Sequence, residues 1–99
     1  MVTYKVYKTN GSVETTTLEK KVVELGDLRR LIGCEWIEPV KYTNNKLICD
    51  EEGKLNNKGW NMKATLRWKE IVQESGSDEI LMIDHLLGNV VEIIEGELE

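Results

Sequence analysis

The dipeptide Asn10-Gly11 is a strong β-hairpin signal, because both residues tolerate the positive φ angles that a tight turn requires. Before it, residues 2–8 alternate apolar and more polar side chains, which is the pattern of a half-buried strand. After it, residues 12–18 include Val13 and three consecutive threonines, which favour a returning strand. The chain is therefore predicted to open with an antiparallel hairpin.

Two segments space their apolar residues as helices do. In residues 25–32 the apolar side chains recur at helical spacing, and Gly33 is placed to end the helix. In residues 61–74, Asn61 is a good N-cap. The apolar stripe of this longer helix is predicted to consist of Ala64, Trp68, Ile71 and Val72.

The rest of the chain favours further short strands. They are predicted in residues 36–43, 46–50, 80–83 and 86–94, with Asn44-Asn45 as a turn and an interruption near Asp84-His85 or at Gly88-Asn89. Pro39 cannot donate a backbone hydrogen bond, so it marks an edge strand or a bulge. The predicted fold class is α+β, a mainly antiparallel sheet with two helices, the longer one packed on one face.

The composition fits one folded domain over residues 1–99, with 98–99 set aside as resembling cloning residues. The 18 acidic residues outnumber the 13 basic ones, and the net charge of -5 argues against a general nucleic-acid-coating surface but not against a local pocket for a small anion. No apolar run reaches the roughly 20 residues that span a bilayer. The N-terminal residues lack the apolar core of a signal peptide. We therefore expect a cytoplasmic protein without membrane association.

The sequence offers little for catalysis. His85 is the only histidine, and no nucleophile, base and orienting group form a recognisable pattern. The spacing of Cys34 and Cys49 matches no zinc or redox motif, so both are expected to be reduced core residues, with a structural disulfide as the alternative. The carboxylates of residues 50–52 are expected to form a solvated turn, and the glycines match no phosphate-binding motif. We therefore expect a protein that is not an enzyme and has no metal or cofactor.

Basic and aromatic side chains on or near the two helices suggest a binding role. Arginine binds phosphate through two parallel hydrogen bonds, and aromatic faces stack on bases. If the helices lie side by side, or meet across a subunit boundary in a homo-oligomer, these groups can converge on one small anionic nucleotide. The alternative is that the tryptophans anchor the core and the arginines are solvated. The predicted ligand-binding residues are Arg29, Arg30, Trp36, Asn61, Lys63, Arg67 and Trp68.

The order of motifs resembles a family of small proteins of unknown function carried by phages and mobile elements. The motifs are a Gly-containing stretch after a short helix, then D-E-E-G-K-L, then N-x-x-A-T, and a closing Leu-x-Gly-Asn-Val; they lie at residues 28–38, 50–55, 61–65 and 86–90. Cys34 stands where the usual second glycine lies, and Lys58-Gly59-Trp60 replaces a loop that usually carries Leu-Pro. The resemblance covers most of residues 1–94 and implies a phage or prophage origin, without implying a reaction.

Three functions compete. The first is a phage anti-defence protein that sequesters a nucleotide signal, of the cyclic ADP-ribose or cyclic oligonucleotide type, inside a bacterial host. The second is an acidic inhibitor, of the anti-CRISPR or anti-restriction type, that binds a host defence protein; the scattered acidic residues suit it less well than a dense stripe would. The third is an enzyme, which the absence of a catalytic pattern disfavours.

Overall fold

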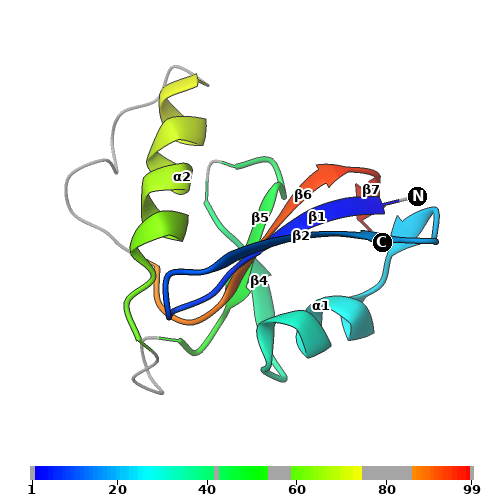
Figure 1. Ribbon diagram of the computed structural model, residues 1–99, viewed down its shortest axis with the longest axis horizontal. Helices are drawn as coiled ribbons and strands as arrows, with labels where there is room; N and C mark the ends of the chain where they lie inside the picture. The colour runs from blue at the N-terminus through cyan, green and yellow to red at the C-terminus, as the bar shows by residue number, and fades with distance from the viewer. Residues whose placement is uncertain (1, 42, 54–58, 75–85, 99) are drawn as a thin grey trace.

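The computed structural model describes residues 2–41, 43–53, 59–74 and 86–98, which form an α+β fold, as predicted (Figure 1). Its main sheet has five strands in the order β2-β1-β6-β5-β4, and every neighbouring pair is antiparallel. A second, two-stranded parallel sheet joins β3 (Val22–Val23) to β7 (Glu97–Leu98). The main strands are β1 (Val2–Tyr7), β2 (Val13–Leu18), β4 (Ile37–Pro39), β5 (Leu47–Asp50) and β6 (Val90–Glu95).

The predicted opening hairpin is confirmed. Strands β1 and β2 pair in an unbroken register from Val2 opposite Leu18 to Tyr7 opposite Val13. In the turn between them Gly11 has a φ of 92°, which favours glycine. Asn10 does not adopt a positive φ; instead its side-chain oxygen accepts a hydrogen bond from the backbone N–H of Ser12 at 2.9 Å, which stabilises the turn.

The two helices pack on opposite faces of the main sheet (Figure 1). Alternate side chains of a strand point to opposite faces, and β1 sends Tyr4 and Val6 to one face and Tyr7 to the other. On the first face, α1 (Leu25–Ile32) buries Leu28 and Ile32. On the second face, α2 (Met62–Glu74) buries the predicted stripe of Ala64, Trp68, Ile71 and Val72.

Both helices begin and end where the residues predict. The side chain of Glu24 accepts a hydrogen bond from the N–H of the third helical residue of α1, and Asp27 there bonds back to the Glu24 N–H. Gly33 ends α1 in the left-handed conformation, with its N–H donating to the carbonyl of Arg29. The Asn61 side chain caps α2 by accepting the backbone N–H of Ala64 at 3.1 Å.

Some predicted strand boundaries differ. The strand expected over residues 36–43 is confined to β4, an edge strand that ends at Pro39. An edge position suits proline because its backbone nitrogen has no N–H to donate to a neighbouring strand. Asn44 and Asn45 both have positive φ, at 56° and 63°, in the predicted turn. The last described strand of the main sheet starts just after Gly88-Asn89; the expected strand at residues 80–83 and the break at 84–85 lie outside the described residues. No helix in the described part of the chain is long and apolar enough to cross a membrane.

Candidate functional site

The main sheet divides the seven predicted binding residues into two groups. Arg29 and Arg30 lie on α1 and Trp36 follows it, whereas Asn61, Lys63, Arg67 and Trp68 belong to the start and body of α2. The two helices do not lie side by side on one face of the sheet, so the seven residues do not converge within a single chain in the way that one of the two considered arrangements requires. Each face of the sheet carries its own row of apolar side chains, and each row needs a helix to cover it.

Arg29, Arg30 and Trp36 line one open depression at the end of α1, which we call the α1 depression. Its volume is about 690 Å³, and Gly33, Cys34 and Glu35 line the rest of it. Trp36 is 57% exposed, an unusual state for so large an aromatic side chain. Its backbone is held in place, because its carbonyl accepts hydrogen bonds from the Glu51 N–H at 2.9 Å and the Cys34 thiol at 3.3 Å.

A buried carboxylate orients one of these arginines. Asp27 is 4% exposed and accepts hydrogen bonds from Arg30 Nη2 at 2.9 Å and from Lys20 Nζ at 2.9 and 3.1 Å. The hydrogen bond from Lys20 is the main cause that lowers the pKa of Asp27, with the N–H of Glu24 and the Arg30 side chain adding to it. The same bond raises the pKa of Lys20. The Arg30 side chain remains 70% exposed, so the N–H donors of its guanidinium that do not bond to Asp27 still face solvent.

Asn61 is a structural residue. It is 1% exposed, and its side-chain amide donates to the carbonyls of Tyr7 at 2.8 Å and Gly88 at 2.9 Å. Its oxygen accepts the Ala64 N–H at the start of α2. Both amide protons are thus used to join α2 to β1 and to the segment before β6. Asn61 therefore has no free side-chain donor for a ligand and does not belong to the candidate site.

Arg67 contributes to an interior network instead of facing solvent freely. Its guanidinium bonds both carboxylate oxygens of Glu92, with Nε at 3.1 Å from each and Nη2 at 3.0 Å from Oε2. Glu92 is 1% exposed and also accepts the Tyr7 hydroxyl at 2.6 Å. Burial, reinforced by the hydrogen bond to Glu92, raises the pKa of Tyr7 far above its usual range. The hydrogen bond to Glu92 likewise raises the pKa of Arg67.

The last two predicted residues also lie on the α2 side of the sheet. Trp68 is 4% exposed in the core, and its indole N–H donates to the carbonyl of Lys41 at 2.9 Å. Its position is therefore that of a core anchor, which was the alternative to a stacking role. Lys63 is exposed on α2. Neither contributes to the α1 depression.

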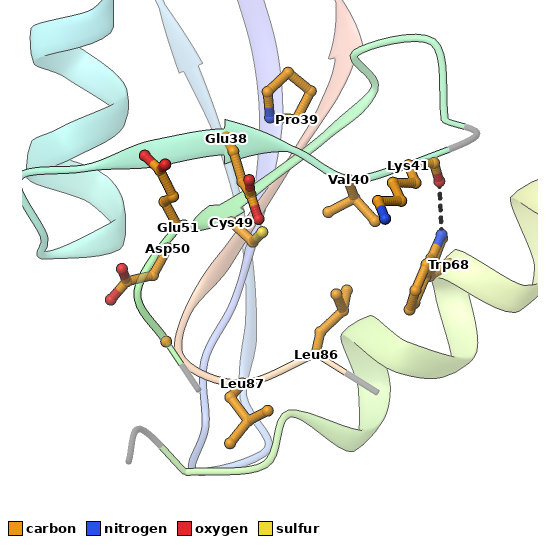
Figure 2. A pocket seen from close by; sticks show the side chains of 11 residues that line it. Glu38, Pro39, Val40, Lys41, Cys49, Asp50, Glu51, Trp68, Leu86 and Leu87 are labelled. Carbon is orange, nitrogen blue, oxygen red and sulfur yellow. Dashed lines mark hydrogen bonds between the residues drawn. The ribbon is translucent and has the colours of Figure 1, made fainter. Parts of the chain in front are cut away.

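A second pocket, which the sequence does not predict, lies on the α2 side of the sheet. It has a volume of about 220 Å³, with Val40, Trp68 and Leu86 among its apolar walls and the carboxylate residues Glu38, Asp50 and Glu51 along one side (Figure 2). The sequence shows Asp50 and Glu51 as neighbours in a polar turn, but it does not show that β4 brings Glu38 opposite Cys49 beside them. Among the described residues no group of three His, Cys, Asp or Glu side chains is arranged to hold a metal ion.

The motifs behind the family resemblance meet beside this second pocket. Gly53, of the D-E-E-G turn, lies so close to the Leu87 carbonyl that a Cβ there would be 2.9 Å from its oxygen. Thr65, of N-x-x-A-T, donates to the carbonyl of Asn61 at 2.8 Å and accepts the Leu86 N–H at 2.9 Å. These motif residues therefore hold three distant chain segments together. The lone histidine, His85, lies outside the described residues.

Comparison with known proteins places the chain in a family. No curated protein and no solved structure matches it. A family model described as a domain of unknown function (DUF3846) matches residues 4–96, nearly the whole chain. The expectation of a family of unknown function is thereby confirmed: the chain belongs to the DUF3846 family.

Proposed function

We propose that this protein binds a small anionic nucleotide in the α1 depression and sequesters it without cleaving it. One observation carries the proposal: two guanidinium groups, from Arg29 and Arg30, and one exposed indole, from Trp36, line the same depression. These are the two kinds of group that a nucleotide needs, cations for its phosphates and a flat face for its base.

The arginines suit phosphate recognition. The guanidinium fork matches two phosphate oxygens, and it stays charged at any physiological pH. Asp27 holds one end of the Arg30 guanidinium, which reduces the conformational freedom that this side chain loses when a ligand binds. Arg29 is exposed beside it and forms no ion pair with the residues that the structure describes.

Trp36 suits base stacking. Its backbone carbonyl is fixed by the Glu51 N–H, just after strand β5, and by Cys34, so the ring is presented to solvent from a fixed point. Stacking of one base on an aromatic ring contributes about 1–3 kcal/mol in single-strand binders. A stacking role also accounts for why an aromatic side chain is left 57% exposed in a small domain.

The proposed biological role rests on the resemblance to small proteins of phages and mobile elements. Such proteins often act against host defences, and some sequester the nucleotide signals of bacterial immunity. We therefore propose a cyclic ADP-ribose or cyclic oligonucleotide signal as the ligand and the cytoplasm of an infected or lysogenic bacterium as the site of action. The enzyme alternative has no catalytic pattern in the sequence to support it.

The first experiment is a thermal-shift screen of the purified protein against cyclic nucleotides and ADP-ribose derivatives. A ligand at 100 times its Kd adds about 2.7 kcal/mol to the free energy of unfolding, which moves the midpoint measurably. Titration calorimetry with the best ligand then compares the wild type with Arg29→Ala, Arg30→Ala and Trp36→Ala. Each arginine variant should bind about 10- to 150-fold more weakly, because it loses a charge-assisted hydrogen bond.

Lys63→Ala is the matched control, since it removes one exposed positive charge on the opposite side of the sheet. It should bind with the affinity of the wild type. A loss of affinity in Lys63→Ala equal to that in the arginine variants would indicate a general charge effect and contradict the proposed site. Glu35 lines the same depression, so Glu35→Gln should strengthen binding by removing a negative charge near the phosphates.

A second candidate function is inhibition of a host defence protein through an acidic surface. The observation that favours it is the grouping of the Glu38, Asp50 and Glu51 side chains along the second pocket (Figure 2). A pull-down from bacterial lysate with the wild type and with Glu38→Lys separates the two functions. Salt-sensitive capture of one defence protein, lost in Glu38→Lys, together with no nucleotide binding, would favour the inhibitor.

A further inference from the structure

The outer edge of the main sheet at β2 is long, regular and exposed. Five of its six residues are exposed and Leu18 is half-buried, and β1 is the only strand of the described residues that pairs with it. The opposite edge, β4, has only three residues and ends at Pro39, which cannot donate a hydrogen bond. The two edges therefore differ in their capacity to accept another strand.

The hydrogen-bond pattern shows which backbone groups of β2 point outward. The Lys8 N–H donates to the Ser12 carbonyl at 2.9 Å, and this pair has the same register as the rest of the hairpin. Hydrogen-bonded pairs alternate along an antiparallel ladder. Residues 14, 16 and 18 therefore bond to β1, whereas the N–H and carbonyl groups of Val13, Thr15 and Thr17 point away from the sheet.

Exposed sheet edges are usually protected by lysines, prolines or bulges, and β2 has none of these. Its sequence from Val13 to Leu18 contains one charged residue, Glu14, which forms an ion pair with Lys8 at 3.0 Å. Its register with β1 is unbroken, whereas the irregularity in this part of the sheet lies between β1 and β6. The edge is regular, almost uncharged and rich in threonine, a residue that favours strands.

We infer that β2 pairs in the antiparallel direction with β2 of a second copy of this chain, related to it by a two-fold axis that passes midway between the Thr15 residues of the two copies. The axis stands perpendicular to the sheet, so each face of one copy continues into the same face of the other. Thr15 then lies opposite Thr15 of the partner subunit, and Val13 lies opposite Thr17 of the partner subunit. All three outward-pointing residues meet outward-pointing residues, which gives about six hydrogen bonds between the copies.

This register also avoids a clash of charges. Glu14 lies opposite Thr16 of the partner subunit, so the two glutamates are not placed directly against each other. Within each copy, the Lys8 side chain already compensates the Glu14 carboxylate. The edge is thus complementary to itself in hydrogen bonding and neutral in charge, which is why a second copy fits it better than a charged partner does.

The test measures the solution mass of the full chain by light scattering and sedimentation over a range of concentrations. The wild type should pass from a mass near 11.4 kDa to twice that mass as concentration rises. Thr15→Pro removes the central outward N–H without removing a bond to β1, and it should remain a monomer. Thr15→Val keeps the N–H and the strand preference, and it should dimerise like the wild type.

Hydrogen exchange of the wild type gives a second measurement that does not depend on how well the proline variant folds. The amides of Val13, Thr15 and Thr17 should exchange quickly in the monomer and become protected as concentration rises, whereas those of Glu14, Thr16 and Leu18 should be protected throughout. A monomer mass at every concentration would overturn the inference. A dimer that persists in the Thr15→Pro variant would also overturn it. The same holds if these amides become protected only when an extended peptide of another protein is added.

Discussion

Glu92 is a carboxylate in the middle of the main sheet, with the Arg67 guanidinium and the Tyr7 hydroxyl as its partners. Removing one member of a buried ion pair leaves the other charge without compensation. Arg67→Ala should therefore lower the free energy of unfolding by about 3–5 kcal/mol. Tyr7→Phe, which removes one hydrogen bond, should cost about 1–3 kcal/mol. Urea unfolding measures both, and Lys63→Ala is the surface control that should change stability by less than about 0.5 kcal/mol.

The sequence suggested Arg67 as a ligand-binding residue, whereas the structure pairs it with the buried Glu92. A full-stability Arg67→Ala variant would contradict the structural role of the network. In the ligand titrations above, Arg67→Ala should keep the affinity of the wild type for as long as it remains folded, because Arg67 lies on the α2 side of the sheet.

Asp27 is expected to control the acid side of the stability curve. Its hydrogen bond from Lys20, then those from Glu24 and Arg30, lower its pKa in the folded state. In the unfolded chain the pKa of an aspartate is about 3.9. Because the pKa of Asp27 is lower in the folded state, its ionised carboxylate contributes its full stabilisation at pH values above the unfolded pKa. This contribution is lost as the pH falls through the folded-state pKa. Asp27→Asn should therefore show a flatter loss of stability in acid than the wild type, measured by urea unfolding at a series of pH values. Parallel curves for the two proteins would contradict this assignment.

At the scale of the elements, the turn after β5 depends on a glycine for lack of space. A Cβ on Gly53 would lie 2.9 Å from the carbonyl oxygen of Leu87 and 3.3 Å from that of Asp50, and neither backbone group can move easily. Gly53→Ala should cost about 1–3 kcal/mol in thermal or urea unfolding. Gly26→Ala is the matched control, because Gly26 is exposed in α1 and a Cβ added there would meet nothing within 4 Å. It should stabilise the protein by about 0.5–1 kcal/mol, and equal effects at the two positions would contradict the close approach.

At the scale of the whole molecule, two apolar cores share one sheet. Ile48, 2% exposed, belongs to the core under α1, and Ile71, 8% exposed, belongs to the core under α2. Because the same strands form a wall of each core, we expect both to be lost in one cooperative transition. Ile48→Ala and Ile71→Ala should each cost about 2–5 kcal/mol, with the same urea dependence as the wild type. Two separate transitions in calorimetry, with each variant shifting only one of them, would contradict this.

The sequence by itself determined the local elements of this protein. The hairpin at Asn10-Gly11, the end of α1 at Gly33 and the capped start of α2 at Asn61 were all predictable, because each depends on the backbone preferences of a few adjacent residues. The buried stripe of α2 was predictable for the same reason, since helical periodicity alone selects one side of a helix. The α+β class follows from these elements.

Only the tertiary structure decided which side chains meet. Arg30 and Arg67 look alike in the sequence, yet one faces the α1 depression and the other pairs with Glu92, which is 25 residues away. Placing the helices on opposite faces separates Asn61 and Lys63 from Trp36, whereas the pairing of β1 with β6 brings Tyr7 and Glu92 together. The physical reason is that periodicity specifies the apolar side of each element, whereas long-range packing selects the face of the sheet against which that side is buried.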